Sequence, residues 1–144
     1  MKKLKILIID NDPIINIGFK SIFKNSSIFE ITSFTNSKDE IIDIICQYEI
    51  DLVISEINFK NGTIKDILKL FKKNNIDVPL VVFTSESNEK KSINLLKLGV
   101  SGFMTKNLKK KSIRQIIEDI AFSKYGSKEL NKFTRLKNRF NFDY

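Results

Sequence analysis

The chain has 144 residues, of which 42% are hydrophobic, and it carries a formal net charge of +8. This apolar content is enough for one domain with its own core, and no apolar run is long enough to cross a bilayer, so we expect no membrane partner. The absence of histidine excludes an imidazole base or ligand, and the single Cys46 excludes an internal disulfide and a cysteine-based metal site, which favours a reducing cytoplasm.

Five short apolar segments alternate with amphipathic segments along the chain. They are rich in Ile, Val and Phe, and several are apolar on both faces, as in a parallel sheet covered by helices on both sides. The strands predicted from them are Lys5–Ile9, Phe29–Phe34, Leu52–Ile57, Leu80–Thr84 and Gly102–Thr105.

The first two predicted helices have recognisable starts. The first runs from Pro13 to Lys24, with proline near its beginning. The second begins at Ser37, and Glu40 three residues later completes a capping-box pattern. Cys46 lies in the apolar part of the second helix, where we expect a small core residue. The residues expected on the buried face of the first helix are Ile14, Ile15, Gly18 and Ile22.

Three further helices follow the third, fourth and fifth strands. The helix before Gly99 runs from about Ser87 to Leu98, and this glycine is a plausible C-terminal cap. The other two helices carry apolar residues at helical spacing. These are Ile64, Ile67, Leu68 and Phe71 in one, and Ile113, Ile116, Ile117 and Ile120 in the other.

Five strand–helix pairs predict a doubly wound α/β fold. Such folds place their sites beyond the carboxyl ends of the strands. Acids, hydroxyls and an amine therefore converge on one rim of the sheet. The residues at these strand ends are Asp10, Asn11, Asp12, Glu56, Thr84, Ser85 and Lys106.

Four segments in this order carry a resemblance to a known family. They are ILIIDNDPIINIGF, DLVISEI, VPLVVFTS and LGVSGFMTKN. Residues 4 to about 125 resemble the receiver domain of bacterial response regulators, in the CheY-like superfamily. The closest resemblance is to the NarL/FixJ-type branch, whose receivers precede a helix-turn-helix DNA-binding domain. It implies a flavodoxin-like, doubly wound five-stranded parallel sheet in the order 2-1-3-4-5 with helices on both faces.

The resemblance also implies roles for the residues at the strand ends. In that family, acids after the first strand and an aspartate after the third bind Mg²⁺, and this aspartate takes a phosphoryl group from a partner kinase. Asp10 matches the first acid, while Thr84 and Lys106 match the hydroxyl and the lysine that hold the phosphoryl oxygens. Phe103 matches the aromatic switch position, although simple packing is the commoner role of such a residue. Thr84 has the equal alternative of an ordinary strand-end hydroxyl bonded to the backbone.

Three departures from the family pattern indicate an atypical receiver. Asn11 stands where the second acid is expected, if Pro13 fixes the register, and Asp12 is directed elsewhere by that register. Glu56 occupies the phosphoacceptor position. The loop INFKNGT lacks the family's Met-Pro and is about two residues shorter by comparison with the family.

These departures weaken the chemistry that the family performs. Mg²⁺ is usually held by carboxylates that offset its charge, and Asn11 removes one of them. The extra methylene of Glu56 moves its oxygens toward Thr84 and Lys106, and phosphoryl transfer tolerates little displacement. We therefore expect no catalytic residue, cofactor or metal ion. The alternative is weak Mg²⁺ binding by Asp10, Glu56 and Asn58.

Glu56 has two further interpretations, and the sequence favours neither. It could form a fixed ion pair with Lys106, which would place negative charge near the position of a phosphoryl group and bias the domain toward one conformation. Alternatively, the pair is a relic that switches nothing.

The C-terminal segment 126–144 forms a second unit after the receiver-like domain at 1–125. Residues 107–144 hold 10 Lys and Arg against 4 acids, whereas residues 1–106 hold 15 Lys against 13 acids. The spacing of the apolar residues predicts one helical stripe, which needs a surface on this domain, a second copy or a downstream domain. The stripe and the basic residues beside it are Leu130, Phe133, Leu136, Phe140, Arg135 and Arg139.

The leading hypothesis is a signalling and dimerisation module without enzymatic activity, whose output in transcription regulation does not depend on aspartyl phosphorylation. The resemblance implies a homodimer formed through the fourth helix, fifth strand and fifth helix. A second hypothesis is a phosphorylatable, Mg²⁺-dependent receiver that uses Asp10, Glu56 and Lys106. A third is binding of DNA, or of another regulator, by the basic C-terminal segment, although a solvated charged face is the commoner reason for such charge. The linker-like GSKEL favours a piece of a longer regulator over a stand-alone receiver.

Overall fold

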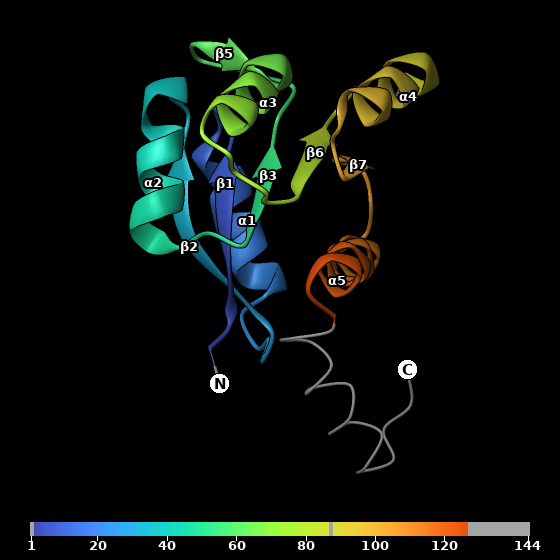
Figure 1. The fold of residues 1–144 in the computed structure, drawn as a ribbon. Coiled ribbons are helices and arrows are strands. Elements are labelled where there is room, and N and C mark those ends of the chain that lie inside the picture. Colours follow the sequence, from blue (N-terminus) through green and yellow to red (C-terminus); the bar gives the residue numbers. More distant parts are fainter. Residues whose placement is uncertain (1, 87, 127–144) are drawn as a thin grey trace.

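The computed structural model describes residues 2–86 and 88–126 of the chain. Five parallel strands form its central sheet in the order β2-β1-β3-β6-β7 (Figure 1). Because β6 and β7 correspond to the fourth and fifth predicted strands, the predicted order 2-1-3-4-5 and the flavodoxin-like fold are confirmed. Within the described residues, no helix is both long and apolar enough to cross a membrane. The strands are β1 Leu4–Ile9, β2 Phe29–Thr35, β3 Leu52–Ser55, β6 Leu80–Thr84 and β7 Gly102–Thr105.

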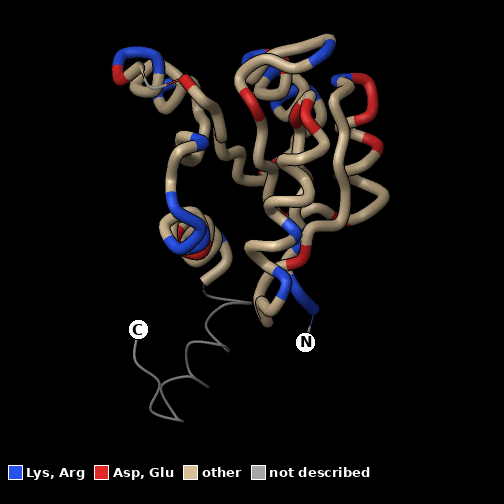
Figure 2. Tube along the Cα trace, turned by 180° about the vertical axis from the view of Figure 1, so that it is seen from behind, with Lys and Arg blue, Asp and Glu red and all other residues tan. Residues whose placement is uncertain are grey.

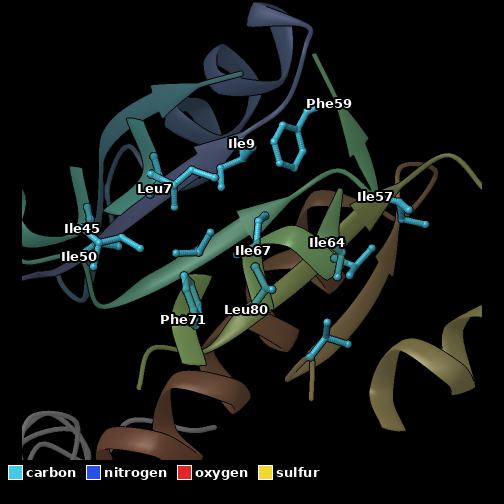
Figure 3. Close-up of a cluster of buried hydrophobic side chains, with 14 of the residues drawn as sticks. Leu7, Ile9, Ile45, Ile50, Ile57, Phe59, Ile64, Ile67, Phe71 and Leu80 are labelled. Atoms are coloured by element: carbon cyan, nitrogen blue, oxygen red, sulfur yellow. The ribbon is translucent and has the colours of Figure 1, made fainter. Parts of the chain in front are cut away.

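Helices cover both faces of the sheet (Figure 1). On one face, α1 (Pro13–Ile22) and α5 (Lys110–Tyr125) pack against side chains such as Ile6 and Ile8 of β1. The alternate residues of the same strand, Leu7 and Ile9, belong to the core on the other face (Figure 3). Every residue of β3 and β6 is buried, which explains why these strands read as continuous apolar runs. The helices of this second face are α2 Ile41–Tyr48, α3 Ile64–Lys73 and α4 Glu89–Leu98.

The first helix buries a different set of residues from the one predicted. Ile14 was expected on the buried face, but it is 67% exposed, and that prediction is wrong. The core position is taken by Phe19, which packs with the partly buried Ile15 and Ile22 against the sheet. Asp12 caps the helix, because its Oδ1 accepts a hydrogen bond from the backbone N–H of Ile14 at 3.0 Å.

The capping box predicted at Ser37 is also wrong. Ser37 precedes a short 3₁₀ helix, η1 (Lys38–Glu40), and its side chain makes no capping hydrogen bond. Glu40 does not reach back to Ser37; its Oε2 accepts a hydrogen bond from Thr35 Oγ1 at 2.7 Å. Thr35, the last residue of β2, thus binds the carboxylate that the sequence pattern assigns to the helix cap. The helix α2 begins only at Ile41, and Cys46 within it is exposed, contrary to the expectation of a core residue.

Side-chain and glycine caps also define the start of α3 and both ends of α4. Thr63 and Asp66 form a reciprocal capping box at the start of α3. Gly99 ends α4 with a φ of +118°, a conformation in which glycine is favoured, so the predicted C-terminal glycine is confirmed. The fourth helix itself begins at Glu89, with Asn88 as its N-cap, slightly later than predicted.

A small hairpin interrupts the expected strand–helix alternation. The strand β3 ends at Ser55, two residues before the predicted end at Ile57. The chain then forms β4 (Asn58–Phe59) and β5 (Gly62–Thr63), which pair antiparallel. Phe59 enters the core beside Ile9 (Figure 3). A Cβ atom at Gly62 in β5 would lie 2.9 Å from the Phe59 ring, so a larger residue there would force this ring to shift.

Tyr125 links the last turn of α5 to the segment before β3 through a hydrogen bond. Its hydroxyl donates a hydrogen bond to the backbone carbonyl of Asp51 at 2.7 Å. Burial, followed by the charges of Asp51 and Asp77, raises the pKa of Tyr125 from 10.0 to about 12. A group with a raised folded-state pKa contributes stability that is complete below its unfolded pKa of 10.0, and that contribution is lost as the pH rises through about 12.

We expect Tyr125→Phe to lower the free energy of unfolding by about 1 kcal/mol at pH 7, because one intramolecular hydrogen bond is lost. The difference between the two proteins should shrink between pH 10 and pH 12, because only the wild type loses the tyrosine contribution there. Urea denaturation at a series of pH values measures both effects. Tyr48→Phe serves as the control, since Tyr48 is an exposed tyrosine on α2, and it should change neither quantity. A constant difference across this pH range would contradict the prediction.

Candidate functional site

Backbone hydrogen bonds place three charged residues at the carboxyl edge of the sheet. The N–H of Asp10, just after β1, donates to the carbonyl of Thr35 in β2 at 3.2 Å. The N–H of Glu56, just after β3, donates to the carbonyl of Ile9 in β1 at 2.9 Å. The N–H of Lys106, just after β7, donates to the carbonyl of Thr84 in β6 at 2.8 Å. Each residue is thus held at the end of its own strand by the neighbouring strand.

The side chain of Lys106 lies between two carboxylates. Its Nζ is 3.0 Å from Asp10 Oδ2 and 3.3 Å from Glu56 Oε1. Asp10 is 3% exposed, so its charge has little access to water and depends on this partner. The sequence-based expectation that Glu56 could pair with Lys106 therefore agrees with the observed contact.

The two carboxylates also stabilise the charged form of Lys106. Burial by itself would lower the pKa of Lys106, but the hydrogen bond with Asp10 and the charges of Glu56 and Asp10 outweigh it and raise this pKa above the ordinary 10.5. The stabilisation is therefore complete below pH 10.5 and is lost as the pH rises through the raised value. The ammonium also lies 5.9 Å from the centre of the Phe83 ring, within the range of a cation–π contact.

The remaining carboxylate oxygens have backbone partners. Asp10 Oδ1 accepts a hydrogen bond from the N–H of Asp12 at 2.9 Å. Glu56 Oε2 accepts one from the N–H of Ile57 at 2.7 Å. All four oxygens of Asp10 and Glu56 are consequently engaged by protein groups, and this fixes the orientation of both side chains.

The other predicted site residues lie nearby but take different partners. Thr84 is buried, and its Oγ1 accepts a hydrogen bond from the N–H of Glu86 at 3.3 Å. The part of the chain that the structure describes contains no hydrogen bond between Glu56 and Thr84, so the longer side chain of Glu56 is directed to Lys106. Phe103 is partly buried and packs against the core on the α2–α4 face, whereas Asn11 is exposed.

The donor set does not fit the Mg²⁺ ion that the family resemblance implies. A magnesium ion is usually held by carboxylates and waters in near-octahedral geometry. Here a lysine ammonium contacts both Asp10 and Glu56, and the exposed Asn11 adds no charge. Asn58, the third ligand considered from the sequence, is exposed on the hairpin strand β4. Across residues 2–86 and 88–126, no group of three His, Cys, Asp or Glu side chains is arranged to hold a metal.

Asn61 is a residue of the site region that sequence reasoning missed. It lies in the turn of the hairpin that follows Glu56, and its Oδ1 accepts a hydrogen bond from the N–H of Lys38 at 2.7 Å. Its Nδ2 donates to Ser37 Oγ and to Asp39 Oδ2, both at 3.3 Å. These bonds tie the hairpin to η1, more than 20 residues away in sequence. The Asn-Gly dipeptide at 61–62 marked a turn, but no local pattern identifies its partner.

The predicted features of the C-terminal segment lie outside the described residues. This applies to the apolar stripe of Leu130, Phe133, Leu136 and Phe140, and to Arg135 and Arg139. They remain predictions.

Comparisons with known proteins agree with the fold. The family model described as response regulator receiver domain matches residues 6–118. The nitrate/nitrite response regulator protein homolog of Haemophilus influenzae is 26% identical over 119 residues, covering 83% of this chain and 57% of that protein. The transcriptional regulatory protein DegU of Brevibacillus brevis is 23% identical over 123 residues, covering 83% of this chain and 50% of that protein. The chain thus spans about half the length of these relatives.

A solved structure extends the comparison to the fold. The crystal structure of a two-component response regulator of the LuxR family from an Aurantimonas species has a TM-score of 0.74 and 17% sequence identity. The match covers 85% of this chain and 87% of that chain. At this level of identity the likeness shows a shared fold.

We expect Lys106→Met to lower the free energy of unfolding at pH 7 by about 3 kcal/mol, because two partly buried carboxylates lose their shared cation. Urea denaturation at pH 7 measures this. The matched control is Lys124→Met, which removes an ion pair with the 91% exposed Asp77 and should cost less than about 1 kcal/mol. Equal losses for the two variants would contradict the prediction.

We expect Asn61→Ala to loosen the hairpin and speed amide hydrogen exchange at Ile57 and Lys38, since three hydrogen bonds to η1 are lost. Hydrogen exchange followed by NMR resolves these two amides. Asn74→Ala is the control, because Asn74 also makes a side-chain hydrogen bond at an exposed position, to the carbonyl of Leu70. If exchange at Ile57 changes no more in Asn61→Ala than in the control, the hairpin does not depend on Asn61.

Proposed function

Because the chain belongs to the response regulator receiver domain family, we propose that it is a receiver module whose conformation is set by a permanent ion pair instead of aspartyl phosphorylation. The observation that carries this proposal is the contact of 3.3 Å between Lys106 Nζ and Glu56 Oε1. The lysine that would hold phosphoryl oxygens in the family already has a charged partner within the chain.

Two properties of Glu56 support a permanent pair. Its carboxylate follows the buried strand β3 and reaches Lys106 without displacing the contact between Lys106 and Asp10. Its second oxygen is held by the N–H of Ile57, so both ends of the carboxylate are anchored. A fixed negative charge beside Lys106 substitutes for part of the charge of a phosphoryl group and biases the domain toward one conformation.

The same contacts argue against efficient phosphoryl transfer to Glu56. The reaction requires an attacking carboxylate in line with the donor and a metal ion that offsets developing charge. Here Lys106 and the Ile57 amide hold both oxygens of Glu56, and Asn11 stands where the family has a second acid. We propose that the pocket binds Mg²⁺ weakly or not at all.

The proposed output is protein association in transcription regulation. The names of the two curated relatives, a nitrate/nitrite response regulator and a transcriptional regulatory protein, support that setting. The proposed interface is formed by α4, β7 and α5. Ile93 and Leu96 on α4 support it, because these large apolar side chains are 44% and 46% exposed.

We expect no phosphoryl group on the wild-type protein after incubation with acetyl phosphate and Mg²⁺. The extra methylene of Glu56 displaces its oxygens from the position of an aspartate carboxylate, and Lys106 pairs with them. Intact-mass spectrometry measures the modification, and sedimentation velocity in the same samples should show no change in self-association. The double variant Asn11→Asp with Glu56→Asp restores both acids of the family pattern and should be labelled more than the wild type.

Glu56→Gln identifies labelling at other sites, since a carboxamide cannot form the acyl phosphate. Stoichiometric, Mg²⁺-dependent labelling of the wild type that disappears in Glu56→Gln would establish the alternative function, a phosphorylatable receiver. Labelling that persists in Glu56→Gln would lie on a group other than Glu56 and leave the proposal intact.

A further inference from the structure

The helices α3 and α4 form a groove with an apolar floor and lysine walls. Its volume is about 440 Å³, which is in the range of sites that take a small ligand or a few side chains of a peptide. The groove lies on the α2–α4 side of the sheet, away from the contacts of Lys106 with Asp10 and Glu56. The lining residues are Lys65, Lys91, Asn94, Leu95, Lys97 and Leu98.

The floor of the groove is an exposed leucine. Leu98, the last residue of α4, is 52% exposed, whereas Leu95 beside it is buried in the core. Residues 91, 94, 95 and 98 share one flank of a helix, while residues 93 and 96 share another. Leu98 lines the groove together with Lys65 of α3, whereas Ile93 and Leu96 do not line it, so the groove differs from the association surface proposed for them. This leucine is largely in contact with water, and a partner that covered it would gain the free energy of removing its apolar surface from water.

The walls of the groove carry positive charge with few counter-charges. The two helices α3 and α4 contain seven lysines, at 65, 69, 72, 73, 90, 91 and 97, against only Asp66 and Glu89. The blue segments of α4 are visible in Figure 2. Asp66 is occupied in the capping box with Thr63. Among the described residues, Lys65 and Lys97 form no salt bridge, and Lys91 forms an exposed one with Glu86 at 2.7 Å.

We propose that this groove docks an acidic peptide segment of a partner protein, with a large apolar side chain seated on Leu98. Charge complementarity selects the occupant, because carboxylates on the segment would meet Lys65, Lys91 and Lys97. A helix in a groove is a common mode of peptide recognition, and α4, whose 10 residues span about 15 Å, supplies all the lining residues except Lys65.

The apolar floor favours a peptide over nucleic acid. A phosphate backbone would pair with the lysines but would leave Leu98 uncovered, since sequence-independent binding of DNA rests on charge. An acidic amphipathic segment satisfies both features of the groove. Its carboxylates contact the walls, and its apolar side chain removes Leu98 and the edge of Leu95 from water. Glu86 already pairs with Lys91, and a carboxylate of the docked segment would displace it from that lysine.

The experiment uses the full chain and a synthetic fluorescein-labelled amphipathic peptide of about 12 residues, with glutamates on one face and leucines on the other. We expect saturable binding by fluorescence anisotropy that weakens with added salt, and NMR shift changes at Lys65, Leu95 and Leu98. Lys65→Glu and Leu98→Ser should each weaken binding by about tenfold or more. Lys20→Glu, an exposed lysine reversal on α1 at the opposite face of the sheet, should leave the affinity unchanged, and circular dichroism checks that every variant is folded.

Two altered peptides separate charge from apolar contact. Replacing glutamates by glutamines, or leucines by serines, should each abolish measurable binding. Binding of the glutamine peptide with the same affinity would overturn the proposal, and so would equal binding by Lys65→Glu, Leu98→Ser and Lys20→Glu. An unlabelled DNA duplex of about 20 base pairs that shifts the same groove residues, with no saturable peptide binding, would assign the groove to nucleic acid and overturn it as well. These measurements do not depend on the Glu56–Lys106 pair, so failure here leaves the proposed function untouched.

Discussion

The ammonium of Lys106 between Asp10 and Glu56 is the contact on which the carboxyl edge of this sheet depends. Asp10 is almost fully buried and Glu56 is largely so, and two such carboxylates repel each other unless a cation lies between them. The lysine comes from the end of β7, the acids from the ends of β1 and β3. One side chain therefore links strands that are not neighbours in the sheet, and their hydrogen bonds to adjacent strands keep the three residues in register.

The hairpin after Glu56 also restricts the position of this carboxylate. The N–H of Ile57 orients Glu56, and the residues that follow form β4 and β5. Asn61 then ties the hairpin to η1, so the segment has little freedom to withdraw. The contacts of Glu56 and Asn61 therefore support the proposal above that this receiver keeps one conformation.

Charge and apolar surface are distributed unequally over the helices. The helix α1 exposes Ile14 and Ile17, whereas α3 and α4 carry seven lysines against Asp66 and Glu89. On α4 the two properties meet, since the flank toward α3 joins Leu98 to the lysine walls and the opposite flank carries Ile93 and Leu96. A helix with exposed apolar residues on two flanks is suited to two separate contacts, which would allow association and partner docking at the same time.

The sequence by itself determined the strands, their order and the meeting of Asp10, Glu56, Thr84 and Lys106 at one rim. The strands and their common edge follow from the periodicity of apolar residues and from the rule that parallel strands direct their carboxyl ends to one edge, whereas the strand order follows from the family resemblance. Tertiary structure alone decided that Thr35, and not Ser37, binds the carboxylate of Glu40, that Phe19 replaces Ile14 in the core, and that Asn61 reaches η1. The physical reason is distance along the chain: local patterns encode a residue's own helix or strand, whereas the partner of a polar side chain is set by whichever distant segment packs beside it.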